Sequence, residues 1–179
     1  MPEIEIHSSN LNEINKLTAI EHGYYTDYAW QMNLQRSFEK AHIDFQRVRL
    51  PRRIFVPYPR NREEIFSGLD QVVQFLVAKY NKQLVGYIKV EGEKEAKVAH
   101  VTDLVVSAAN RRQGIASGLL LAVMDILIKH DYRNLLLEMQ SKNDPAISLA
   151  TKLGFNFCGY RDHYFANQEL ALFYSRFIR

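Results

Sequence analysis

The sequence is poor in cysteine and has no strong excess of charge. Its only cysteine is Cys158, so it can form no internal disulfide and offers no cysteine cluster for zinc. Its 6 histidines show no metal-binding spacing. The net charge of +3 is too small to argue by itself for nucleic-acid binding. We therefore expect no metal site, and we expect Cys158 to be a small core residue rather than a nucleophile.

Long apolar runs are also missing. The longest, Leu119 to Met124, is far too short to span a bilayer. The first residues lack the basic segment and apolar run of a signal peptide. The 179 residues suit one domain, and 47% hydrophobic with 24% charged residues is ordinary globular composition. These features predict a single cytoplasmic domain over residues 1–179 with no membrane partner.

Hydrophobic periodicity predicts an α+β fold. Alternating apolar residues predict a short strand at 4–6, and Asn10 is placed to cap a helix that follows. An antiparallel meander is predicted over 72–79, 84–90 and 98–106, with turns at Asn81–Lys82 and Gly92–Lys94. The remaining predictions are a buried helix over 114–130, a strand over 134–139, a helix capped by Asp144 and ended by Gly154, and a hairpin of 155–164 with 170–178.

Residues 47–62 combine six arginines with Pro51, Pro57 and Pro59. Proline is excluded from helix interiors and central strands, so we predict an edge strand and an extended loop. With Phe55 and Tyr58 as stacking platforms, this stretch could serve a nucleic-acid binder. The proline breaks and the modest charge argue against that function, and we expect no nucleic-acid partner.

The segment from Val101 to Ala116 predicts a diphosphate site. A strand ends at Val106, a loop follows, and a helix begins at R-R-Q-G-I-A. The first N–H groups of a helix lack internal partners and lie at the positive end of its dipole. Small residues there let a diphosphate approach those groups, and neighbouring arginines can add charge-assisted contacts. The residues concerned are Gly114, Ala116 and Gly118 with Arg111 and Arg112. Neither a Walker loop nor G-x-G-x-x-G is present, and a surface turn with two solvated arginines is the alternative.

R-R-Q-G-I-A resembles the acyl-CoA pyrophosphate motif of the GNAT superfamily, (Q/R)-x-x-G-x-(G/A). In that superfamily the motif follows a strand like 103–106 and precedes a long helix, a strand and a second helix ending in L-G-F, here Leu153–Phe155. The resemblance implies a GNAT fold, with a mixed, mostly antiparallel central sheet flanked by helices. It also implies a cofactor half at about 74–155 and acceptor-side elements at 1–73 and 156–179.

The resemblance implies acetyl-CoA as the cofactor and assigns residues to it. Backbone groups of Leu104, Val105 and Val106 should pair with the pantetheine arm like an added strand. Asn143 resembles the family asparagine that touches pantetheine, with helix capping as the alternative. Lys152 lies where a basic residue often meets the adenosine end, with a solvated helix face as the alternative. The diphosphate should be held by N–H groups of Arg112, Gln113, Gly114, Ile115, Ala116 and Ser117.

The resemblance also implies the chemistry, which is direct attack of an amine on the thioester with a carboxylate or water taking the proton. Glu138 lies among apolar neighbours in 135–139, where an unpaired carboxylate is costly. Its position resembles the general base of ribosomal-protein alanine acetyltransferases. Asp103 resembles the acidic position of other branches. Either carboxylate could instead fix a backbone amide or pair with an arginine.

The pattern departs from the family at Ala150. The family has a tyrosine four residues before the glycine of L-G-F, and this tyrosine reprotonates the CoA thiolate. Tyr160 and Tyr164 are the candidates nearby in sequence to replace it, and water is the alternative. The third explanation is a protein that binds acyl-CoA without catalysis.

An aromatic set lies where such proteins build the acceptor wall, although a plain core role is equally consistent with it: Tyr24, Tyr25, Tyr28 and Trp30. The stretches 159–162 and 171–174 are similar to the tails of streptothricin acetyltransferases. We therefore predict an N-acetyltransferase whose partners are acetyl-CoA and an amine acceptor, and a homodimer is left open.

Overall fold

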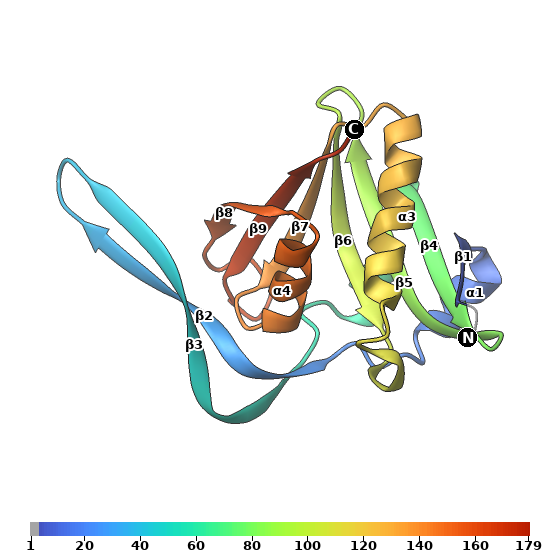
Figure 1. Ribbon diagram of the computed structural model, residues 1–179, viewed down its shortest axis with the longest axis horizontal. Helices are drawn as coiled ribbons and strands as arrows, with labels where there is room; N and C mark the ends of the chain where they lie inside the picture. The colour runs from blue at the N-terminus through green and yellow to red at the C-terminus, as the bar shows by residue number, and fades with distance from the viewer. Residues whose placement is uncertain (1–3) are drawn as a thin grey trace.

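The computed structural model describes residues 4–179 as one mixed sheet with helices on both faces and a projecting ribbon (Figure 1). The first half of the chain forms β1 (Ile4–Ser8), α1 (Leu11–Leu17), β2 (Tyr24–Arg36), β3 (Ala41–Val56), α2 (Arg62–Phe66), the 3-10 turn η1 (Leu69–Gln71), β4 (Val72–Tyr80) and β5 (Gln83–Glu93). The second half forms β6 (Val98–Val106), η2 (Ala108–Asn110), α3 (Ile115–Lys129), β7 (Asn134–Gln140), α4 (Asp144–Lys152), β8 (Asn156–Arg161) and β9 (Ala171–Phe177).

Seven strands form the main sheet in the order β1-β4-β5-β6-β7-β9-β8. Only β6 and β7 are parallel, because α3 connects them as a crossover, and the other neighbours are antiparallel. The expected α+β class with a mostly antiparallel sheet is therefore confirmed. Figure 1 shows α3 and α4 together on one face of this sheet.

Side-chain alternation along the strands supplies a core on each face of the sheet. On β4, Leu76 and Ala78 pack in the larger cluster with α3 and α4. The intervening Phe75 and Val77 pack in a second cluster that includes Leu17 of α1 and Ile65 of α2. The functional elements at the middle of the sheet are therefore fixed from both sides.

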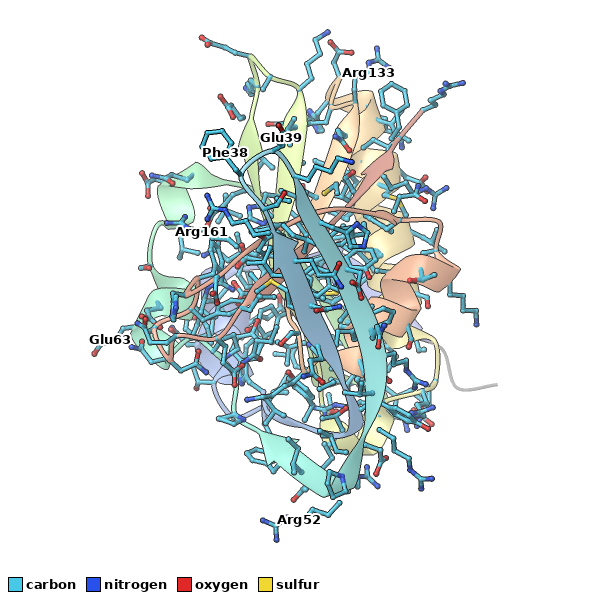
Figure 2. The ribbon with its side chains drawn as sticks, turned by 90° about the vertical axis from the view of Figure 1, so that its left-hand side faces the viewer. Phe38, Glu39, Arg52, Glu63, Arg133 and Arg161 are labelled. Atoms are coloured by element: carbon cyan, nitrogen blue, oxygen red, sulfur yellow. The ribbon has the colours of Figure 1, made fainter. Side chains whose placement is uncertain are left out.

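Strands β2 and β3 form a separate two-stranded ribbon that extends beyond the body of the molecule (Figure 1). The predicted edge strand and loop underestimated this element, since β3 alone has 16 residues. Pro51 is tolerated because the pairing register shifts between Thr26 and Tyr28, leaving residues 50–53 of β3 without regular partners. Figure 2 shows Phe38 and Glu39 at the tip and Arg52 pointing away from the body.

Three sequence-based details need correction. Asn143, not Asp144, caps α4, because the Asn143 Oδ1 accepts the N–H of Ala146 at 3.2 Å. β5 continues to Glu93, so the predicted turn at Gly92 begins two residues later. Cys158 is exposed rather than buried, since it lies on the edge strand β8 where the register with β9 shifts. No helix among the described residues is long and apolar enough to cross a membrane.

Candidate functional site

The parallel pairing of β6 with β7 stops halfway along both strands. The register runs from Val98 opposite Asn134 to Val101 opposite Leu137 and includes no later pair. Beyond it, residues 104–106 of β6 pair with β5 on one side. A pocket, which we call the slot, lies at this opening. Its lining comes from the α3 and α4 side at Leu120, Asn143, Ala146, Leu149 and Ala150, and from the other end at Tyr58, Pro59, Arg60, Glu138, Gln140 and Phe165.

The helix that follows β6 presents its N-terminus without a side-chain cap. Gly114 precedes α3 with φ 85°, and no side chain bonds to the first turn. The N–H groups of the first turn, residues 114–117, have no acceptor within the helix. A Cβ added at Gly114 would meet no protein atom within 4 Å, so the space beside Gly114 is open. This geometry fits a diphosphate bound by backbone amides.

Gly118 has a different reason to be small. A Cβ added there would lie 3.1 Å from the Cδ1 of Ile6 on β1. The absence of a side chain at Gly118 therefore lets α3 pack closely on the sheet, and our expectation that it clears space for a ligand was wrong.

The side chain of Arg111 forms hydrogen bonds to the protein's own backbone. Its Nε donates to the carbonyl of Val106 at 2.8 Å, and its Nη2 donates to the carbonyls of Gly23 at 2.8 Å and Glu21 at 3.3 Å. Burial lowers the pKa of Arg111. The side chain thus ties the start of β2 to the end of β6. Arg112, exposed and at φ 62°, is the arginine of this pair that is free of such bonds.

The two other expected cofactor residues lie on α4. Asn143 caps the helix and also lines the slot, so the two interpretations of this residue are compatible. Lys152 is exposed in the last turn of α4. Ala150 is fully buried and lines the slot, which leaves no hydroxyl at the position where the family has its tyrosine.

Of the two predicted carboxylates, Glu138 lines the slot at the end opposite the helices, and Asp103 lies next to that end, in contact with the slot residue Arg60. Leu137 and Met139 belong to the cluster under α3 and α4, so Glu138 between them faces the other side of the sheet. Asp103 faces the same way, because Val105 two residues later packs in the second cluster. Their side chains are 1% and 0% exposed, respectively. Buried carboxylates need partners, and these two share Arg60.

Arg60, from the loop between β3 and α2, connects the two carboxylates. Its Nη1 donates to the carbonyl of Thr102 at 2.6 Å and lies 3.5 Å from the Oδ1 of Asp103. Its Nη2 forms an ion pair with the Oε1 of Glu138. Among the described residues, the Asp103 Oδ2 and the Glu138 Oε1 are buried without a hydrogen-bond partner, and of these two oxygens only the Glu138 Oε1 is in an ion pair.

Two tyrosines complete the network. The hydroxyl of Tyr58 donates to the Oδ1 of Asp103 at 2.6 Å, and the hydroxyl of Tyr164 donates to the Oε2 of Glu138 at 2.6 Å. Burial raises the pKa of Tyr58 well above its ordinary value, and the charge of Asp103 raises it further. Tyr58 therefore remains a hydroxyl donor at neutral pH.

Two histidines lie beside the carboxylates. The Nε2 of His100 is 3.0 Å from the Oε2 of Glu138, and the Nε2 of His22 is 2.9 Å from the hydroxyl of Tyr87. Burial lowers the pKa of both histidines, and Arg60 lowers that of His100 further. Both imidazoles are accordingly neutral near pH 7.

The aromatic set at the start of β2 divides between the interior and the surface. Tyr24 is buried, and its hydroxyl donates to the Oε1 of Gln140, a residue that lines the slot, at 3.0 Å. Tyr25 is 55% exposed and points outward. Tyr28 lies under the guanidinium of Arg47, and the Trp30 Nε1 donates to Asp144 at 3.2 Å. Among the four, Tyr24 is thus the one connected directly to the slot.

The structure separates the two tyrosines proposed as acids. Neither tyrosine lines the slot, but Tyr164 donates to the slot residue Glu138, whereas the ring of Tyr160 packs against Phe45 of the ribbon. Four residues of this network were not predicted as site residues from the sequence: Arg60, Tyr58, His100 and His22. One signal was available for Arg60, because two carboxylates in apolar strands required a cation and residues 47–62 were rich in arginine.

The chain matches the acetyltransferase (GNAT) family over residues 22–155. It is 34% identical over 108 residues to the N-alpha-acetyltransferase of Sulfurisphaera tokodaii, covering 54% of this chain and 65% of that protein. It is 36% identical over 93 residues to the N-terminal acetyltransferase B complex catalytic subunit NAA20 of Arabidopsis thaliana, covering 50% of this chain and 53% of that protein. The matches thus span about half to two thirds of these relatives.

The fold is similar to solved acetyltransferases along nearly the whole chain. A nourseothricin acetyltransferase superposes with TM-score 0.84 at 18% identity, covering 98% of this chain and 99% of the other. A putative streptothricin acetyltransferase from Bacillus anthracis, solved with acetyl coenzyme A, gives 0.78 at 15% identity, covering 98% and 100%. The ribosomal-protein-S18-alanine N-acetyltransferase of Escherichia coli gives 0.70 at 18% identity, covering 98% and 94%. With a family match over residues 22–155, this chain belongs to the GNAT acetyltransferase family, whose members use acetyl-CoA.

Proposed function

We propose that this protein transfers acetyl from acetyl-CoA to a primary amine of a small molecule or peptide. The observation that carries the proposal is the slot at the opening between β6 and β7, which runs from Leu120 of α3 and the start of α4 to the buried carboxylate of Glu138. Arg60 connects Glu138 to the second buried carboxylate, Asp103. The diphosphate would bind at residues 112–117 and the pantetheine along 104–106 and Asn143. The thioester would then lie near Glu138. Lys152 is the proposed contact for the adenosine end.

In the proposed reaction, the neutral amine nitrogen attacks the thioester carbonyl. The C–N bond forms, the C–S bond breaks, and CoA leaves as a thiolate that takes up one proton. The amine releases one proton, which Glu138 accepts directly or through water, with Asp103 as the second candidate base. The hydroxyl of Tyr164 donates to Glu138, so Tyr164 can supply the proton to the CoA thiolate in place of the family tyrosine, whose position is Ala150 here.

The proposal keeps the division of one domain into a cofactor half at about 74–155 and acceptor-side elements at 1–73 and 156–179. Tyr24 and Phe165 then form acceptor walls, since Tyr24 bonds to Gln140 and Phe165 lines the slot. The related N-terminal acetyltransferases and the similar fold of antibiotic acetyltransferases suggest two acceptor classes to test, peptide N-termini and aminoalkyl compounds. A cytoplasmic location remains a prediction.

The test is to measure acetyl-CoA binding by calorimetry and CoA release with a panel of peptides, diamines and lysine-type amines. We expect micromolar binding, about 8 kcal/mol, and release with at least one amine. Glu138→Gln should lower kcat by about 10²–10⁴-fold and leave acetyl-CoA binding unchanged. Binding without release for any amine would instead support a non-catalytic acyl-CoA-binding protein. Absence of binding would refute both.

A further inference from the structure

No backbone pairing joins β6 to β7 beyond the start of the slot, so side chains must hold the two strands together there. The last backbone pair is Val101 with Leu137, and the next residues on each strand are Thr102 and Glu138. Thr102 is also the extra residue of a bulge, because Lys89 of β5 pairs with Asp103 while Val90 pairs with Val101. The two strands are therefore free to separate at the point where the slot begins.

Two negative charges also lie close together where β6 and β7 separate. Asp103 and Glu138 are carboxylates with side chains 0% and 1% exposed, and they face the same side of the sheet. Two buried carboxylates repel each other and are costly without a cation. Two other cationic side chains have other partners: Lys89 contacts Ser67 and Glu91, and Arg47 contacts Asp144. His100 has its pKa lowered by burial and adds no charge near neutral pH.

Arg60 meets both requirements. Its guanidinium contacts the carbonyl of Thr102 and the carboxylate of Asp103 on β6, and the carboxylate of Glu138 on β7. A guanidinium presents several donors in one fixed plane, so it can connect acceptors on two strands, whereas an ammonium is a single point of charge. Arg60 is 22% exposed on its side chain and lines the slot, so it also lies at the border of the acceptor space.

We infer that Arg60 is a positioning residue that bridges β6 and β7 past the end of their ladder and holds Glu138 and Asp103 in place for proton transfer. The inference rests on the proposed function and adds to it a residue outside the cofactor half. Arg60 acts through the carboxylates, so its loss should affect turnover more than cofactor binding. The diphosphate contacts at the α3 N-terminus do not involve it.

The experiment compares Arg60→Gln, Arg60→Lys and Arg60→Ala with the matched control Arg176→Gln. Arg176 also donates to a backbone carbonyl at 2.6 Å, that of Leu153, but lies outside the slot. We expect kcat to fall at least about 100-fold in Arg60→Gln and less in Arg60→Lys, the range of a displaced general base. Acetyl-CoA binding should stay within about threefold, because the diphosphate site is independent. Methylguanidinium should restore turnover to Arg60→Ala, and sodium chloride of equal ionic strength should not.

A second readout does not depend on turnover. Hydrogen exchange of the amides in 102–104 and 138–140 should accelerate in Arg60→Gln and not in Arg176→Gln, because only the first loses the bridge. Wild-type exchange and turnover in Arg60→Gln would overturn the inference and leave the proposed function intact. If the wild type releases no CoA with any amine, the proposed function fails, and unchanged exchange in Arg60→Gln would refute the bridge separately.

Discussion

At the scale of single residues, a substitution at Gly114 can affect the protein through backbone strain or through the ligand site, and a second glycine allows the two effects to be separated. Its φ of 85° is unfavourable for other residues, yet an added Cβ would touch no protein atom within 4 Å. Gly68 has the same two properties, with φ 62° and no protein atom within 4 Å. Strain at either position should cost about 1–2 kcal/mol. The protein therefore carries its own control for the diphosphate site.

We predict that Gly114→Ala and Gly68→Ala lower the melting temperature by similar amounts and that only Gly114→Ala weakens acetyl-CoA binding. A methyl group at Gly114 would project into the space where backbone N–H groups meet the diphosphate. Thermal unfolding and calorimetric titration measure the two effects. Equal affinities in the two variants would remove Gly114 from the cofactor site.

The site as a whole shows how residue identity and residue role can differ. Arg111 fits the family motif, and its side chain also bonds three backbone carbonyls, a structural role that the motif does not indicate. Glu138 was predicted from its apolar surroundings and its resemblance to a family base, and Asp103 from the resemblance alone. Their shared partner Arg60 was not, because it is 43 residues from Asp103 in the sequence, and the arginine-rich stretch 47–62 does not indicate which of its arginines makes the contact.

At the scale of elements, the β2–β3 ribbon has a base packed on the body and an exposed outer part. Near the base, Phe45 packs against Phe157 and Tyr160 of β8, and the N–H of Trp30 donates to the carbonyl of Ser141. Further out, Leu34 is 48% exposed and Phe38 at the tip is fully exposed. The two parts should therefore contribute differently to stability.

We predict that replacing residues 33–44 with Asn-Gly leaves the body folded and acetyl-CoA binding within about twofold, since distant sites are nearly independent. Met32 pairs with Phe45, so a two-residue turn can join them in register. Phe45→Ala should lower the melting temperature, because it removes the contacts with β8. Circular dichroism and calorimetry test both variants. A loss of cofactor binding in the shortened protein would show that the outer ribbon reaches the slot.

At the scale of the whole molecule, buried histidines set the response to acid. The pKa of His22 and of His100 is lowered from 6.5, mainly by burial. The unfolded chain therefore binds more protons than the folded one below about pH 6.5, and stability falls as the pH decreases through that value. Arg60 favours the neutral form of His100, while Glu91 and Asp103 oppose it.

We predict that His100→Gln has a flatter stability curve than the wild type between pH 7 and 5, since one proton-linked group is removed. Urea midpoints at several pH values measure this slope. An unchanged slope would show that the pKa of His100 is the same in the folded and the unfolded chain. A later acid step is expected from Glu13, whose pKa Lys79 lowers to about 2, so its stabilisation is lost only as the pH falls from 4.5 towards 2.

The sequence by itself determined the order of elements from β4 to β9, the glycine turn before α3 and the family. These features depend on local periodicity, capping and glycine placement, which neighbouring residues specify. Val98–Val106 was predicted with the bounds that the structure shows. The tertiary structure alone decided the length of the ribbon, the exposure of Cys158 and the partners of the carboxylates. Cross-strand pairing and a buried ion pair join distant residues, so their energy depends on the fold as a whole and leaves no local pattern in the sequence.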